Sequence, residues 1–121
     1  FGWAGRDPRP GTRREGRWLL GTGTAAASFP SGALPSTAAV TAEADGTFTV
    51  RIAAADIGTG ARTALTLVAA DALRVAPDRV RVHIGDSDFG PAGIAGGSMG
   101  TRSWAWAITA AAGELRDRLG P

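Results

Sequence analysis

Two glycine-rich runs hold the residue types best suited to binding a polar or anionic ligand. The first is Asp56-Ile57-Gly58-Thr59-Gly60, which stands before a stretch with apolar residues at helical spacing. The second is Gly96-Gly97-Ser98-Met99-Gly100-Thr101-Arg102-Ser103, which adds hydroxyls and a guanidinium before another helical pattern. Glycine lets the backbone approach a ligand closely, and the N–H groups of a helix's first turn favour an anion. Both runs therefore predict ligand-binding loops, and the second is the richer in donors.

Neither run matches a nucleotide-binding motif. The dinucleotide fingerprint needs a third glycine three residues after Gly60, where this chain has Thr63. A P-loop needs a lysine, and the chain contains none. Each run also has a simpler interpretation. The first can be a tight turn that enters a helix, and the second a capped helix start after a flexible loop. The local pattern alone leaves both interpretations open.

The titratable side chains favour structural roles over catalysis. Asp86 and Asp88 could bind a hard cation or act as acid and base, but aspartates that follow a strand usually form turns. Asp56 is interpreted as a turn or cap residue, and His83, which alternates with arginines, as a solvent-facing or interface residue. One histidine and no cysteine exclude a multi-histidine metal site, a thiolate site and a cysteine nucleophile within these residues. We expect no catalytic residue and no metal ligand here.

Composition places the chain among globular domains. Its 121 residues are 44% hydrophobic and 20% charged, which suits one core and argues against wholesale disorder. The net charge is +2, but residues 1–18 carry five arginines against Asp7 and Glu15, a local +3 that leaves −1 for the rest. We interpret this stretch as a solvated arginine-rich leader. Phosphate or nucleic-acid binding through it is a further alternative, although a nucleic-acid interface needs a larger clustered excess.

The elements that must position the two glycine runs form an α+β pattern. Alternating apolar residues, an Asp45-Gly46 hairpin signal and helical spacing predict the order β-β-β-α-β-α. We expect a mixed sheet of about four strands with two helices packed on one face. Residues 1–16 are the predicted leader or linker, and residues 17–121 the predicted domain. The strands are expected at 17–28, 37–44, 47–53 and 79–84, and the helices at 61–74 and from a Ser98 or Thr101 cap to about 119.

The second helix has a two-sided pattern. Trp104 and Trp106 are two residues apart and cannot share one helical face. One is therefore expected in the core, and the other exposed or buried against a part of a larger protein. The chain begins with Phe1 rather than methionine, which fits an excised fragment. The apolar stripe of this helix is expected to hold Trp104, Ile108, Ala111, Ala112, Leu115 and Leu119.

Several short pieces stand in a characteristic order along nearly the whole chain. They are Phe1-Gly2-Trp3, Arg6-Asp7-Pro8-Arg9-Pro10-Gly11, Gly21-Thr22-Gly23, Asp45-Gly46-Thr47, Asp56-Ile57-Gly58-Thr59-Gly60 with Thr63, Ala69-Ala70-Asp71-Ala72-Leu73, Gly85-Asp86-Ser87 and Gly96-Gly97-Ser98-Met99-Gly100-Thr101. This ordered set resembles the molybdenum-cofactor-binding subunit of the xanthine dehydrogenase / aldehyde oxidase family.

The resemblance implies part of a molybdenum hydroxylase, an enzyme that oxidises aldehydes or N-heterocycles with oxygen from water. It implies that this chain supplies glycine-rich loops that line the molybdenum cofactor, molybdopterin. Thr59 stands where the family's turn places a glutamine near the molybdenum, and the family's later loop wraps the pterin and its phosphate. The family's catalytic glutamate lies in a later segment, and no glutamate here matches it. The implied cofactor-binding residues are Gly58, Thr59, Gly60, Gly97, Ser98, Met99, Gly100 and Thr101.

The same resemblance sets expectations for partners. Iron–sulfur clusters and FAD would lie on other domains or subunits, and the remaining domains of the molybdenum subunit would complete the cofactor site. We expect neither nucleic acid nor a membrane as partner, a cytoplasmic location, and self-association of the isolated chain through an exposed apolar face. The alternative is a small non-catalytic α+β structural or interaction domain whose glycine loops only cap helices.

Overall fold

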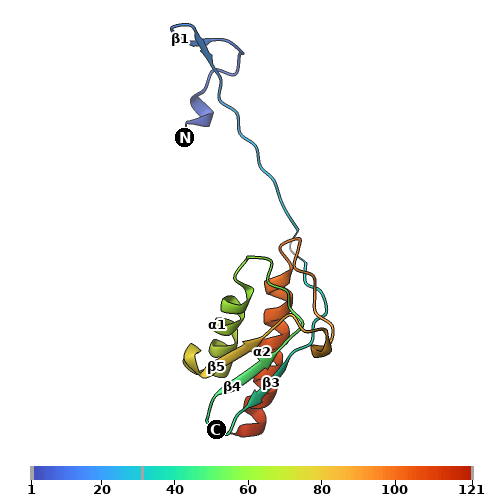
Figure 1. Ribbon diagram of the computed structural model, residues 1–121. Coiled ribbons are helices and arrows are strands. Elements are labelled where there is room, and N and C mark those ends of the chain that lie inside the picture. Colours follow the sequence, from blue (N-terminus) through green and yellow to red (C-terminus); the bar gives the residue numbers. More distant parts are fainter. Residues whose placement is uncertain (1, 31, 121) are drawn as a thin grey trace.

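The computed structural model describes residues 2–30 and 32–120. Its compact part is a three-stranded mixed sheet in the order β3-β4-β5, with both helices on one face (Figure 1). β3 (Ala39–Ala42) pairs antiparallel with β4 (Phe48–Arg51), which pairs parallel with β5 (Val80–His83). α1 (Ala61–Leu73) is the crossover between β4 and β5, and α2 (Gly100–Leu119) packs beside it. The predicted α+β class and the placing of the helices are confirmed.

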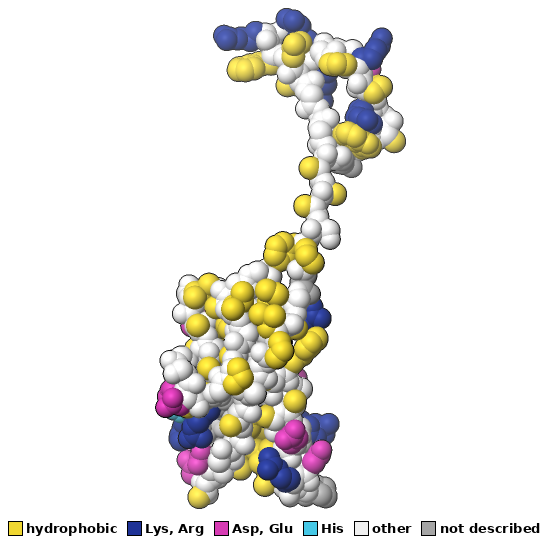
Figure 2. Space-filling model, turned by 90° about the vertical axis from the view of Figure 1, so that its right-hand side faces the viewer, with side chains coloured by type: hydrophobic (Ala, Val, Ile, Leu, Met, Phe, Trp, Pro, Cys, Tyr) yellow, Lys and Arg dark blue, Asp and Glu magenta, His cyan; other side chains and the backbone are white. Residues whose placement is uncertain are grey.

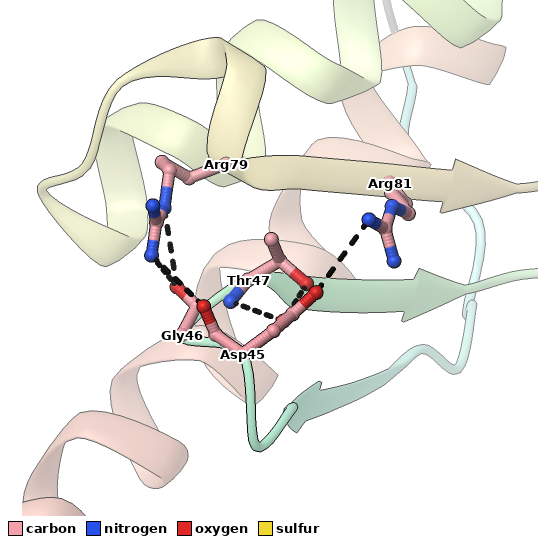
Figure 3. Close-up of polar contacts among 5 residues, drawn as sticks. All are labelled: Asp45, Gly46, Thr47, Arg79 and Arg81. Atoms are coloured by element: carbon pink, nitrogen blue, oxygen red, sulfur yellow. Dashed lines mark hydrogen bonds and ion pairs between the residues drawn. The ribbon is translucent and has the colours of Figure 1, made fainter.

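A tight turn at Asp45-Gly46 joins β3 to β4, as the sequence predicts. The Asp45 carboxylate accepts the backbone N–H of Thr47 at 2.9 Å, and Gly46 adopts a left-handed φ of 76°. Arg79, at the end of the short 3-10 turn η2 (Pro77–Arg79), donates to the Gly46 carbonyl at 2.7 Å (Figure 3). Arg79, which leads into β5, thus holds the turn of the β3–β4 hairpin beside the start of β5.

The core lies between the sheet and the two helices. The register sets Val40 opposite Val50 and Val50 opposite Val82, so apolar side chains of all three strands face the helices. Trp104 is only 2% exposed whereas Trp106 is 59% exposed, which confirms that one tryptophan belongs to the core. Leu119, which the sequence pattern assigns to the apolar stripe, is instead exposed because it ends α2 beyond the core. The largest fully buried side chains are those of Trp104, Ile52, Leu65, Ile108 and Val50.

The N-terminal part forms a separate hairpin. β1 (Arg13–Glu15) pairs antiparallel with β2 (Trp18–Leu20), after a 3-10 turn η1 (Trp3–Gly5). The expected close-packed strand at 17–28 is wrong, because β2 is only three residues long and Trp18 is 66% exposed. The expectation of loop alone in residues 1–16 is also wrong at β1. Gly16 explains the hairpin, since its φ of 59° allows a two-residue turn between these strands.

An extended segment, residues 21–30, joins this hairpin to the compact part (Figure 1). All of its residues are exposed. Within the described residues, no helix has the combination of length and apolarity that crossing a membrane requires.

Candidate functional site

The two predicted glycine loops meet in one pocket. Both helix N-termini lie at the end of the compact part where the extended segment joins it (Figure 1). A pocket of about 290 Å³ opens there between the loop before α1 and the loop before α2. In the view of Figure 2, hydrophobic side chains gather toward this end, and most charged side chains of the compact part lie toward the other. The pocket is lined by Ile57, Thr59, Ala95, Gly96, Ser98, Gly100 and Thr101.

The structure divides the predicted binding residues into two groups. Thr59, Ser98, Gly100 and Thr101 line the pocket itself. The other four, Gly58, Gly60, Gly97 and Met99, belong to the loops but not to the lining. Sequence reasoning did not single out the apolar lining residues Ile57 and Ala95, although each is adjacent to or inside a predicted run.

The first loop folds around the carboxylate of Asp56. Its Oδ1 accepts the backbone N–H groups of Gly58 at 3.0 Å and Gly60 at 3.1 Å, and its Oδ2 accepts that of Arg62 at 3.4 Å. Asp56 is therefore a turn residue that also caps the start of α1, which agrees with the sequence interpretation. Because these donors are already used by the chain's own carboxylate, this loop cannot offer them to an anionic ligand.

This environment shifts the pKa of the Asp56 carboxyl. Desolvation is the largest single effect and raises the pKa of the Asp56 carboxyl. The backbone N–H donors of Arg62 and the glycine loop together outweigh it, so the pKa lies below the ordinary aspartate value. The wall formed by the first loop consequently holds a negative charge at neutral pH.

The second loop makes a different turn. The Met99 N–H donates to the Gly96 carbonyl at 3.0 Å, and the two residues between them, Gly97 and Ser98, have φ values of 59° and 57°. Positive φ at both central residues is the pattern of a type I′ turn, and it is unusual for serine. This turn carries Ser98 to the lining of the pocket.

α2 begins without a side-chain cap. Met99 is its N-cap residue and makes no capping hydrogen bond through its side chain. The prediction of a Ser98 or Thr101 cap is wrong, because Ser98 lies in the left-handed turn before the N-cap and Thr101 is already the second residue of the helix. The first-turn N–H groups of Gly100 and Thr101 are groups that a helix cannot satisfy internally.

Packing and buried hydrogen bonds hold the start of α2 in place. A Cβ on Gly100 would lie 2.8 Å from Cη2 of Trp104, so only glycine fits at this position. Trp104 Nε1 donates to the Gly93 carbonyl at 2.8 Å, which fastens the loop to the helix. The Ser103 hydroxyl donates to the Met99 carbonyl at 2.7 Å and accepts the Leu34 N–H at 2.9 Å. The second wall of the pocket is therefore held in place by packing and hydrogen bonds, although the side chain of its N-cap residue, Met99, makes no capping hydrogen bond.

The acidic and histidine candidates lie elsewhere. Asp86 accepts the Asp88 N–H at 2.9 Å and starts the 3-10 turn η3 (Ser87–Phe89), so it acts as a turn former. His83 is exposed at the end of β5. Among residues 2–30 and 32–120, no group of three or more His, Cys, Asp and Glu side chains is arranged to hold a metal ion.

The lining of the pocket suits binding more than proton transfer. Its polar side chains are the hydroxyls of Thr59, Ser98 and Thr101, and none of its lining residues is titratable. Hydroxyls and first-turn N–H groups donate to phosphate oxygens and to polar ring atoms.

Comparisons with known proteins identify the family of this chain. A family model described as a molybdopterin cofactor-binding domain matches residues 1–121. Over 119 residues the chain is 40% identical to the aldehyde oxidoreductase molybdenum-binding subunit PaoC of Escherichia coli (strain K12), covering 98% of this chain and 16% of that protein. It is 36% identical over 119 residues to the probable hypoxanthine oxidase XdhD of the same strain, covering 93% of this chain and 12% of that protein. The chain spans less than a fifth of either relative, and it belongs to the molybdopterin cofactor-binding domain family.

Proposed function

We propose that this chain forms one wall of the molybdopterin site in a molybdenum-dependent oxidoreductase that hydroxylates an aldehyde or an N-heterocycle. The observation that carries the proposal is the meeting of Thr59 with Ser98, Gly100 and Thr101 in one pocket, from loops about forty residues apart in the sequence. Membership of the molybdopterin cofactor-binding family supports the choice of ligand.

The residues present fit an anionic, polar cofactor. Ser98, Thr101 and the N–H groups of Gly100 and Thr101 would hold its phosphate, because these O–H and N–H groups are donors at a helix N-terminus. Thr59 would donate from the opposite wall. The Asp56 carboxylate lies at the N-terminus of α1, and its negative charge would direct the anionic group toward α2. When bound, the cofactor would supply the oxidation chemistry, and this chain's residues would bind and orient it.

The pocket offers one side of a complete site. Ligand sites generally enclose most of the ligand surface, which two short loops cannot do alone. Both relatives are several times longer than this chain. We therefore propose that further domains of a longer molybdenum subunit form the other walls, with iron–sulfur and flavin groups on other domains or subunits. A cytoplasmic location belongs to the same proposal and is tested by cell fractionation.

The first test is the intact mass and the molybdenum content of the natural gene product. We expect a polypeptide much longer than this chain that holds molybdenum and molybdopterin in a stoichiometric amount. A natural product of this length without molybdenum, alone or with partner chains, would instead favour the non-catalytic interaction domain.

A substitution in the first turn of α2 tests the pocket itself. Thr101→Glu adds a carboxylate beside the place proposed for the phosphate, and we expect about tenfold weaker molybdopterin binding, the equivalent of about 1.4 kcal/mol of charge repulsion. The matched control is Thr109→Glu, which adds the same charge to an exposed position of the same helix outside the pocket. Molybdopterin and molybdenum would be quantified in both full-length proteins. Equal loading in the two variants would remove this pocket from the proposed site.

A further inference from the structure

We propose that Asp56 is the positioning residue of this pocket, because its carboxylate holds the glycine loop in the shape that presents Thr59 to the ligand. Asp56 does not itself line the pocket, so it acts through Thr59. The inference rests on the proposed function, since it concerns the same ligand.

Packing does not fix the shape of this loop. A Cβ built on Gly58 or Gly60 would meet no heavy atom within 4 Å, and every residue from 55 to 60 is exposed. Both glycines nevertheless adopt left-handed φ values, 93° and 73°. A loop of this kind has many accessible backbone conformations, and glycine adds to them.

Hydrogen bonds to one carboxylate select a single conformation. The Asp56 oxygens accept the N–H groups of Gly58, Gly60 and Arg62 at 3.0 to 3.4 Å. These donors lie on either side of Thr59, so the carboxylate fixes the backbone on both sides of the one polar side chain that this loop contributes to the pocket. The carboxylate is ionised near neutral pH and can accept from all three donors, and its lowered pKa extends this state to more acidic solution.

Without the carboxylate, the loop would have to become ordered when the ligand binds, and the entropy cost of that ordering would lower the affinity. Ordering even one residue's backbone on binding opposes affinity, so we expect Asp56→Ala to weaken molybdopterin binding about tenfold. Asp56→Asn keeps one carbonyl acceptor of similar geometry, and we expect it to restore most of the binding.

Asp45 provides a matched control at the other end of β4. Its carboxylate also holds a turn, since Oδ1 accepts the Thr47 N–H at 2.9 Å and the Thr47 hydroxyl at 2.6 Å (Figure 3). It also forms an ion pair with Arg81 at 3.6 Å. Asp45→Ala should therefore also destabilise the protein, and it should leave molybdopterin binding unchanged because Asp45 lies away from the pocket.

The experiment compares the full-length wild type with these three variants by two measurements. The first is the molybdopterin content together with the affinity of the cofactor-free protein for added molybdopterin. The second is hydrogen exchange of the peptide that contains residues 56–62, measured without cofactor. We expect Asp56→Ala to lose both cofactor binding and protection of this peptide, Asp56→Asn to keep most of both, and Asp45→Ala to keep both.

Two other results would overturn the inference in distinguishable ways. If the wild type binds molybdopterin and Asp56→Ala binds it equally well, or Asp45→Ala loses as much affinity, Asp56 has no special role at the pocket. If the wild type binds no molybdopterin at all, the proposed function fails and the positioning role fails with it.

Discussion

The two helices that meet at the pocket begin in opposite ways. At the start of α1 the chain's own carboxylate, Asp56, accepts the N–H groups of the N-cap Gly60 and of Arg62, in an exposed loop that packing does not hold. α2 begins at Met99 with no side-chain cap, but its first residue, Gly100, is buried against Trp104. One wall is thus shaped by hydrogen bonds and carries a negative charge, while the other is shaped by packing and has no acidic residue in its first turn.

This difference assigns the two walls separate roles toward a ligand. The first turn of α2 favours an anionic group, because the positive end of the helix dipole lies there and the side chain of its N-cap residue, Met99, makes no capping hydrogen bond. At α1 the same effect is already balanced by the charge of Asp56, and that wall contributes the Thr59 hydroxyl, which can donate to an uncharged part of the ligand. Two loops of similar composition therefore have different chemistry, which depends on one aspartate.

The largest effect is expected from removing the packing that holds the start of α2. In Gly100→Ala the new Cβ would meet Cη2 of the buried Trp104 at 2.8 Å and the Ile94 carbonyl at 3.1 Å. Overpacking of this kind should lower the free energy of unfolding by about 1–3 kcal/mol. Equilibrium unfolding in urea, with CD as the probe, would measure it.

The matched change in the same helix is Gly113→Ala. No heavy atom lies within 4 Å of a Cβ at Gly113, so alanine should raise the free energy of unfolding by about 0.5–1 kcal/mol through its better helix propensity. Equal effects of the two substitutions would mean that the start of α2 is not held by close packing.

A smaller effect is expected from adding charge at each helix N-terminus. Thr101→Glu should stabilise the cofactor-free protein by about 0.3–1 kcal/mol, because a carboxylate in the first turn of a helix interacts favourably with the helix dipole and no lining residue of the pocket carries a negative charge there. Thr63→Glu adds the same charge to the first turn of α1, where the negative charge of Asp56 already offsets the helix dipole, so we expect a smaller gain. Thermal unfolding at low and high salt would show the difference and its screening. A gain at Thr63 as large as that at Thr101 would contradict the distinction between the two walls.

Residue patterns in the sequence predict most of the compact fold. The alternation of apolar and polar residues in 79–84 predicts which side chains of β5 face the helices. The two-residue spacing of Trp104 and Trp106 predicts that one is buried and the other exposed. The hairpin at residues 13–20 is not predicted, because β1 consists of Arg13, Arg14 and Glu15 and therefore lacks the alternation of apolar and polar residues that indicates a strand.

The pocket is predictable only in part. Both loops stand out by their glycines and hydroxyls, but no local pattern shows that they meet, since that depends on α1 and α2 packing side by side. Ser98 was open to interpretation as a cap because serine is a preferred N-cap residue. Its left-handed backbone depends on the turn with Gly97, which composition alone does not reveal.

The smallest effect concerns the response of stability to acid. The folded pKa of Asp56 is lowered, so its contribution is fully present above the unfolded aspartate value of about 3.9 and is lost as the pH falls through the folded pKa. Asp56→Asn should therefore reduce the fall in urea midpoint between pH 7 and pH 3. Thr101→Glu should increase it, because the new carboxylate gains its stabilising interaction only when ionised. If both variants follow the wild-type pH profile, the charges at the two helix starts do not contribute to stability, and the difference between the walls is steric alone.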